Sequence, residues 1–290
     1  MPDAAMDIGV LKERARIVGA IRRFFDGQGF VEVETAVRIP APAPEAHIDC
    51  PVVEGRPATY LRASPELQMK KLLAAGMENI YQIGPCFREG ERGARHNPEF
   101  TMLEWYRRGA DYRDIQEDLT RLFASLGGSS DFKTLRVRDA YRACAGWDPW
   151  ETWDRDRFDF DMATKVEPAI GEMGGGVFLM DYPPQVCSLA RISSSPVDSC
   201  PRAERWEFYM DGIELANCFS ELCEKDEQLK RFEAEKEERK LLKESDYPID
   251  YAFIKCIPKI RKAAGIALGV DRLVMVLTKK KEISAVRADL

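Results

Sequence analysis

The spacing of apolar residues predicts a helix near the start of the chain, followed by a strand. Apolar side chains recur every three or four residues from Leu11 to Phe25, and two glycines shortly after Phe25 end this run. That spacing places them on one face of a helix. Residues 30–34 then mostly alternate between apolar and polar positions, which predicts a strand with two different faces. The proline-rich residues 39–49 predict an irregular crossover.

The rest of the chain alternates between helical and strand patterns. We expect helices at residues 66–77, 114–126, 224–244 and 271–278, and strands at residues 80–87, 100–106, 206–209, 213–215 and 266–268. Ser64 can cap the first of these helices. Asp211-Gly212 predicts a hairpin turn between two strands. The charge of helix 224–244 indicates a solvated surface.

Residues 127–180 have a weak pattern, in which we expect only a helix around residues 137–144. Many strands joined by hairpins, with helices between them, predict an α+β fold: an antiparallel sheet flanked by helices.

The composition narrows the classes of function. The 290 residues are 45% hydrophobic, enough for a full core, and carry a net charge of −6. An acidic balance argues against unspecific binding to nucleic acid. No apolar run is long enough to span a membrane, and the N-terminus has no signal pattern. Eight scattered cysteines and only two histidines argue against zinc and for reduced thiols in a cytoplasmic protein.

Two arginines suggest a site for a polyphosphate. Arg88 begins a loop that also contains Arg92, Arg95 and His96, and guanidinium groups bind phosphate in a bidentate fork. Taken alone, this loop fits a solvated basic loop equally well. Phe100 begins the returning strand, where its ring could stack on a purine.

The second arginine, Arg272, lies at a predicted helix start, directly after an apolar strand. A helix N-terminus attracts anions, and Gly269 has no side chain that would block a close approach. Arg88 and Arg272 together fit a folded triphosphate, so the sequence indicates an enzyme that uses ATP.

Polar residues interrupt an otherwise apolar stretch at residues 214–222. Asn217 and Glu221 are four apart and share a face in either a helix or a strand. Glu214 and Glu221 would lie on opposite faces of a regular strand, so they converge only if the strand ends or bulges between them. Two carboxylates near ATP are typical of a magnesium site.

These segments resemble the catalytic core of class II aminoacyl-tRNA synthetases, and most closely its lysine branch. The resemblance is carried by HNPEFTMLEWY (residues 96–106), ELANCFSEL (214–222) and GIALGVDR (265–272). The first helix begins near residue 10, which leaves no room for an anticodon-binding barrel. The chain is therefore similar to the stand-alone family of elongation factor P–(R)-β-lysine ligases, with one catalytic domain over residues 1–290. Ser64 and Ala267 favour this family, because the enzymes that charge tRNA have alanine and glycine there.

The resemblance implies a reaction in two steps. ATP and lysine or (R)-β-lysine give an aminoacyl-adenylate and pyrophosphate, and the acyl group then passes to a lysine ε-amine of elongation factor P. It also implies a cytoplasmic homodimer that needs Mg²⁺ and uses neither tRNA nor a membrane.

The resemblance also assigns residues. Arg88 and Arg272 would be catalytic: Arg88 on the α-phosphate and the substrate carboxylate, Arg272 on the terminal phosphates. Glu214 and Glu221 would hold Mg²⁺. The residues implied to bind ATP are Arg88, Glu89, Gly90, His96, Asn97, Phe100, Glu214, Leu215, Gly269 and Arg272. Those implied to bind the amino acid are Ser64, Pro65, Glu66, Glu104, Tyr106, Asn217, Glu221 and Ala267.

The chain departs from the family pattern at three places. Gly90 replaces the glutamate that would contact adenine, and Glu91 or the Glu89 backbone could substitute for it. Cys218 replaces a glycine and would narrow the amino-acid pocket. Thr35-Ala36 lacks the proline of the motif that forms the family's dimer contact. Two other functions stay open: a truncated lysyl-tRNA synthetase-like enzyme that charges tRNA, and an inactive regulator that binds an amino acid as a signal.

Overall fold

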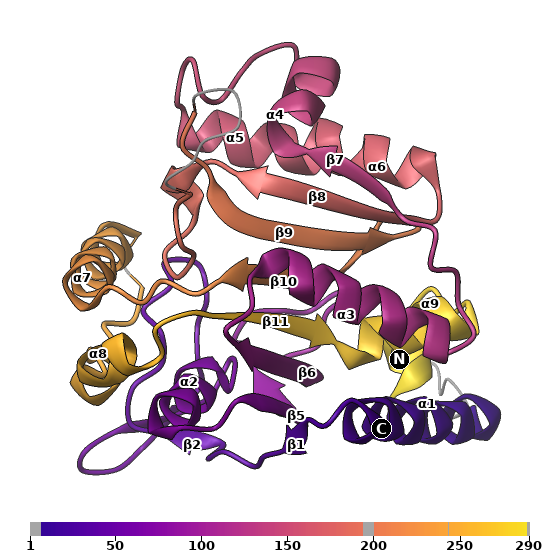
Figure 1. The fold of residues 1–290 in the computed structure, drawn as a ribbon, viewed down its shortest axis with the longest axis horizontal. Helices are drawn as coiled ribbons and strands as arrows, with labels where there is room; N and C mark the ends of the chain where they lie inside the picture. The colour runs from indigo at the N-terminus through magenta and orange to yellow at the C-terminus, as the bar shows by residue number, and fades with distance from the viewer. Residues whose placement is uncertain (1–6, 194–199, 243, 289–290) are drawn as a thin grey trace.

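The computed structural model describes residues 7–193, 200–242 and 244–288. Within these residues an eight-stranded sheet forms the centre of the molecule, in the order β1-β5-β6-β11-β10-β9-β8-β7 (Figure 1). The two edge strands pair in parallel with their neighbours, and the other pairs are antiparallel. The predicted α+β class is confirmed. In sheet order the strands are Val31–Glu32, Asn79–Phe87, Glu99–Arg108, Ala263–Gly269, Ile213–Ser220, Ala203–Met210, Gly176–Tyr182 and Lys133–Arg136.

Three helices cover one face of this sheet. They are α1 (Ile8–Gly27), α3 (Tyr112–Ser125) and α9 (Val270–Thr278). Between them and the sheet lies the largest apolar cluster, which includes Phe25, Trp105 and Trp206, all fully buried. Because side chains alternate across a strand, Leu103 and Trp105 of β6 face this core while Glu104 and Tyr106 point to the opposite face. That opposite face carries the cavity described below.

Smaller elements complete the fold. A second, three-stranded sheet joins β2 (Arg38–Ile39), β4 (Thr59–Leu61) and β3 (Val52–Val53). Helices α2 (Glu66–Ala75) and α8 (Tyr251–Cys256) contact each other at the side of the central sheet, and α8 contacts α7 (Lys225–Leu242) (Figure 1). The hydroxyl of Ser64 accepts a hydrogen bond from the Glu66 amide at 3.0 Å, as expected for the start of α2.

The weakly patterned residues 127–180 are more regular than their sequence indicates. The expected helix exists as α4 (Val137–Ala140), continued by the π-helical residues Tyr141–Ala145. The sequence pattern does not predict the last two strands of the sheet, β8 and the edge strand β7, nor the helices that cover them. These helices are α5 (Arg155–Asp161), the π-helical Met162–Val166 and α6 (Glu167–Met173). Aromatic contacts between distant residues hold this region, such as the stacked rings of Tyr141 and Phe158, whose centroids lie 4.6 Å apart.

Helix α7 forms where expected, with residue 243 of the predicted range outside the described residues. Its charges are not all solvated, however. Arg239 is 1% exposed and donates hydrogen bonds to the carbonyl oxygens of Glu45 and Ile48 at 2.7 and 3.0 Å. The solvated-surface interpretation is therefore wrong for this side chain, which fastens the proline-rich crossover to the helix.

The predicted hairpin joins β9 and β10. Asp211 and Gly212 have φ values of +49° and +73°, as a two-residue hairpin turn requires. The strand register then shifts, since Glu214 pairs with Tyr209 but Ala216 pairs with Phe208. The extra residue, Leu215, is a β-bulge of the kind that re-aims neighbouring side chains.

We predict that Gly212→Ala lowers the free energy of unfolding by about 1–3 kcal/mol. The positive φ disfavours any side chain, and a Cβ atom would lie 2.9 Å from the Cα atom of Gly171. Urea denaturation of both variants measures the change. The matched control is Gly27→Ala, at the end of α1, where nothing lies within 4 Å of the added atom. Equal stability of Gly212→Ala and the parent would contradict the prediction.

Candidate active site

A cavity of about 460 Å³ opens on the sheet face opposite α1, α3 and α9. Strands β6, β10 and β11 form its floor, and its walls include residues from segments 45–48, 64–66, 88–97 and 186–190. Among the residues predicted for the site, the cavity is lined by Ser64, Glu66, Arg88, His96, Asn97, Phe100, Glu104, Tyr106, Glu214, Leu215, Asn217, Ala267, Gly269 and Arg272. Four predicted residues do not line it: Pro65, Glu89, Gly90 and Glu221.

Strand register brings the predicted amino-acid residues into rows. Ala267 of β11 pairs with Glu104 of β6 on one side and with Asn217 of β10 on the other. Asn217 pairs in turn with Glu207 of β9. Directly opposite residues on neighbouring strands have Cβ atoms about 4.5–5.5 Å apart, so Glu104, Ala267 and Asn217 form a continuous strip of the cavity floor, with Glu207 next to its end.

A second row contains Tyr106, Gly265, Phe219 and Arg205. The Tyr106 ring lies across Gly265, where a Cβ atom would be 2.1 Å from the ring. The Tyr106 hydroxyl donates to a Glu104 carboxylate oxygen at 2.9 Å, and the Ser64 hydroxyl donates to the other at 2.5 Å. Both oxygens of Glu104 are thus held in place.

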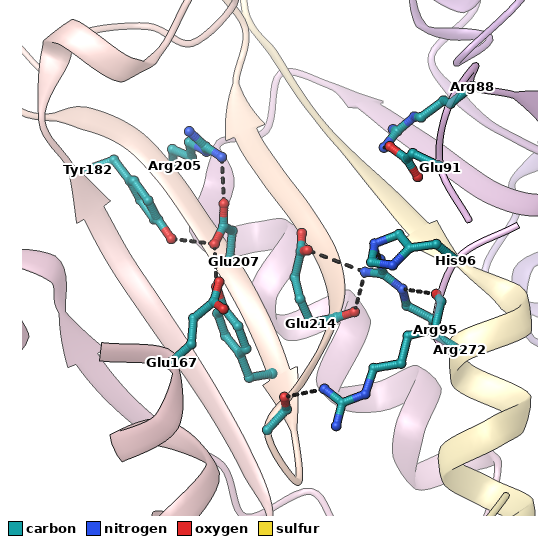
Figure 2. A network of polar contacts seen from close by, with 12 residues as sticks. Arg88, Glu91, Arg95, His96, Glu167, Tyr182, Arg205, Glu207, Glu214 and Arg272 are labelled. Carbon is teal, nitrogen blue, oxygen red and sulfur yellow. Dashed lines mark hydrogen bonds and ion pairs between the residues drawn. The ribbon is translucent and has the colours of Figure 1, made fainter. Parts of the chain in front are cut away.

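The cationic end of the cavity contains Arg88 and Arg272. The guanidinium of Arg88 lies 5.1 Å from the centre of the Phe100 ring and 3.4 Å from the Glu91 carboxylate. Arg272 donates to the Glu214 carbonyl at 3.0 Å and lies 3.3 Å from its carboxylate (Figure 2). The two distant arginines therefore share one cavity.

His96 belongs to the same end. Its Nε2 atom lies 2.6 Å from a guanidinium nitrogen of Arg272 (Figure 2). Burial and then the positive charge of Arg272 lower the pKa of His96, so its imidazole is neutral at pH 7 and accepts this hydrogen bond.

Asp271 fixes the start of α9. Its buried carboxylate accepts a hydrogen bond from the Thr101 amide at 2.9 Å and lies 2.5 Å from Arg14 and 3.1 Å from Arg287. Asp271 is therefore structural. It holds the start of α9, and Arg272, the third residue of this helix, extends into the cavity.

The opposite end of the cavity is acidic. Burial and then the nearby charge of Glu66 raise the pKa of Glu104 to about 7. The ammonium of Lys70, which is 2% exposed, pairs with both Glu66 and Glu221, the latter at 2.5 Å. Burial alone would lower the pKa of Lys70, but these two carboxylates outweigh it and raise the pKa.

Glu221 therefore does not lie where the magnesium prediction needs it. The strand both bulges after Glu214 and ends before Glu221, but Glu221 pairs with Lys70 instead of lining the cavity. The structure instead places Glu207 near Glu214 (Figure 2). Burial and then the charge of Glu207 raise the pKa of Glu214, so a divalent cation between these carboxylates would relieve their repulsion.

Sequence reasoning missed Glu207, Arg205, Lys70 and Glu45. Counting back from the Asp211-Gly212 turn, with one bulged residue, would have placed Glu207 opposite Asn217. Arg205 supports this pair, since it donates to Glu207 at 2.6 Å and to Asn217 at 3.0 Å. Lys70 lies four residues after Glu66, a spacing that favours an ion pair on one helix. No sequence pattern pointed to Glu45.

Comparison with known proteins agrees with this geometry. Residues 8–288 match the profile of the family described as tRNA synthetases class II (D, K and N). The chain is similar to proteins named elongation factor P–(R)-β-lysine ligase: 35% identical to that of Vibrio cholerae serotype O1, over 99% of this chain and 96% of the relative. It is 36% identical to those of Pasteurella multocida (96% and 94% covered) and Vibrio atlanticus (98% and 96%). In the described part of the chain, no helix combines the length and apolar character needed to cross a membrane.

We predict that Lys70→Met lowers the free energy of unfolding by about 3–5 kcal/mol, because it leaves two carboxylates without their buried cation. Urea denaturation measures the loss. The double variant Lys70→Met/Glu221→Gln should recover part of it, since one of these charges is then removed. Lys230→Met, at an exposed position of α7, is the matched control and should change stability by less than about 0.5 kcal/mol. A loss no larger than that of the control would contradict a role for the ion pair.

Proposed function

Since the chain belongs to the family of class II tRNA synthetases (D, K and N), we propose that it is an ATP-dependent ligase that modifies elongation factor P. It activates (R)-β-lysine or lysine as an adenylate and transfers the acyl group to a lysine ε-amine. The observation that carries the proposal is a single cavity with arginines at one end and buried carboxylates at the other. The negative charge of a triphosphate complements the arginines, and the ammonium groups of a diamino acid complement the carboxylates.

The activation step needs the substrate carboxylate next to the α-phosphorus of ATP. Arg88 lies at the cationic end and would bind both groups, which holds the attacking oxygen in place and offsets the negative charge that develops on phosphorus. Arg272 and the neutral His96 would hold the terminal phosphates and stabilise the departing pyrophosphate. Phe100 would stack on the adenine. No protein nucleophile is required.

The amino groups of the substrate would occupy the acidic end. Glu104 and Tyr106, with Ser64 beside them, present fixed acceptors for an ammonium group, and Glu66 lies close to them. Lys70 already pairs with Glu66 and Glu221, so the pocket contains more carboxylates than cations until a ligand binds. A diamino acid corrects this imbalance, whereas an apolar amino acid would leave buried charges without partners.

Mg²⁺ would be held by Glu214, with Glu207 as the neighbouring carboxylate. When bound, the ion neutralises phosphate oxygens as charge moves onto pyrophosphate. The chain itself positions the two carboxylates. The bulge at Leu215 directs Glu214 toward Arg272, and three hydrogen-bond donors hold Glu207. These are Tyr182, Tyr209 and Arg205, at 2.6, 2.7 and 2.6 Å (Figure 2).

Two further features belong to the proposal. A homodimer is supported by the edge position of β1 in the sheet and by its exposed Val31. A cytoplasmic location fits a role in modifying a translation factor. Neither feature changes the chemistry of the cavity.

Mass spectrometry of elongation factor P tests the function. After incubation with this chain, ATP, Mg²⁺ and (R)-β-lysine or lysine, one lysine of elongation factor P should gain the mass of the aminoacyl group. The same enzyme should exchange labelled pyrophosphate into ATP without tRNA. The control is Arg272→Ala, which should abolish exchange and leave the thermal unfolding transition intact.

The two alternative functions give different results. A chain that transfers lysine to tRNA but not to elongation factor P would be a truncated synthetase. A chain that binds an amino acid but exchanges pyrophosphate with none would be a regulator. Either result would refute the proposal.

We also predict that ionisation of Glu104 raises the affinity for the diamino acid by up to about tenfold between pH 6 and pH 8. The ammonium group binds the ionised form of Glu104, whose pKa is about 7 in the free site because of burial and the nearby Glu66. Binding lowers that pKa, so protons are released below pH 7. Calorimetry in two buffers of different ionisation enthalpy measures the release. Glu104→Gln should bind more weakly and with a smaller pH dependence, and a wild type that releases no protons would contradict the assignment.

A further inference from the structure

Glu45 is a cavity residue for which the proposed chemistry has no role. It lies in the proline-rich crossover between β2 and β3 and lines the cavity together with Ile48. The side chain is partly buried. Its carboxylate makes no hydrogen bond or ion pair with any residue in the described ranges 7–193, 200–242 and 244–288. A partly buried carboxylate without a partner in the protein is available to bind a cationic group of a ligand.

The backbone around Glu45 is rigidly held. Arg239 of α7 donates to the Glu45 and Ile48 carbonyls and, at 2.5 Å, to the Asp49 carboxylate. The Ala46 amide donates to Glu235 of the same helix at 2.9 Å. An irregular segment with this many contacts presents its side chain in a fixed place, which favours binding because little freedom is lost.

The same segment is also fastened to the loop that follows β5, at the residue directly after Arg88. The Glu89 amide donates to the Asp49 carbonyl at 2.8 Å. Residues 45–49 and Arg88 are therefore held in one geometry relative to each other. Helix α7 sets that geometry from outside the cavity.

The charges around Glu45 locate it along the cavity. Burial and then the nearby carboxylate of Glu66 raise the pKa of Glu45 to about 7; the other charges that act on it are Arg88, Glu235 and Arg205. Glu104, by contrast, is acted on by Glu66 and Lys70. The hydrogen bond between the Glu89 amide and the Asp49 carbonyl places the segment that carries Glu45 next to Arg88, whereas Ser64 and Tyr106 hold Glu104 at the acidic end of the cavity.

We infer that Glu45 binds the amino group nearer to the substrate carboxylate, while Glu104 binds the distal amino group. The inference rests on the proposed function, in which Arg88 holds that carboxylate. An amino group one or two carbons from the carboxylate must lie close to Arg88, and Glu45 is the unpaired carboxylate on that side. Glu45 thus selects substrates with two amino groups over those with only a terminal one.

Calorimetric titration at pH 8 tests this role with three compounds: (R)-β-lysine, lysine and 6-aminohexanoic acid, which lacks the amino group near the carboxylate. The wild type should bind a lysine isomer more tightly than 6-aminohexanoic acid. Glu45→Gln has nearly the same shape without the charge, and should weaken binding of that isomer about 10–100-fold. Affinity for 6-aminohexanoic acid should change less than about twofold. The matched control is Glu54→Gln, an exposed position in the same part of the chain, which should change neither affinity.

The outcomes are distinct. Equal weakening of all three compounds by Glu45→Gln, or no weakening, would overturn the inference, since a structural role does not distinguish them. If the wild type discriminates through Glu45 but exchanges no pyrophosphate, the proposed function fails and the assignment of Glu45 stands. If exchange occurs but Glu45→Gln binds lysine isomers normally, only the assignment fails. A wild type that binds no diamino acid would overturn both.

Discussion

The position of β11 between β6 and β10 is the constraint on which the rest of the site depends. Its backbone pairing on both sides places Ala267 between Glu104 and Asn217, residues that are far apart in sequence. The same pairing brings the start of α9 to the cavity, where the Asp271 carboxylate ties it to Thr101 of β6. Arg272 can reach the cavity only because of this arrangement. A slip of one residue in β11 would turn Ala267 and Gly269 toward the core and separate the two charged ends of the cavity.

The two ends of the cavity differ in how far their charges are balanced by other residues of the chain. The cationic end is internally balanced in part, because Arg88 lies near Glu91 and Arg272 near Glu214. The acidic end is not, since Lys70 is shared by two carboxylates and the pKa of Glu104 is raised by burial and by Glu66. In the free site the carboxylates of the acidic end therefore repel one another, and the ammonium groups of a bound ligand remove this repulsion. Selectivity for a diamino acid then follows from charge balance as much as from shape.

The sequence predicted those parts of the structure that depend on local patterns. The helix at residues 8–27 and the hairpin at Asp211-Gly212 could both be inferred from spacing, whereas the bulge was only one of two conditions for Glu214 and Glu221 to converge. The fold of residues 127–180 could not, because rings such as Tyr141 and Phe158 meet only in three dimensions. The assignment of Glu221 to the metal was mistaken because it, too, depended on a contact between distant residues that the sequence does not reveal. Its partner Lys70 lies on another element, and only the fold shows that Glu221 forms this ion pair and does not line the cavity.

The departures of the chain from its family pattern also acquire a physical meaning. Cys218, expected to narrow the amino-acid pocket, is fully buried in the main core on the face of β10 away from Asn217, so its thiol does not enter the cavity. Gly90 has a φ of +74°, which a glycine adopts without strain, and it does not line the cavity, whereas Glu91 does. The turn at Gly90 is followed by a carboxylate 3.4 Å from the Arg88 guanidinium. Glu91 therefore brings a carboxylate into the cavity although position 90 has none. A comparison of aligned positions alone would count that carboxylate as lost.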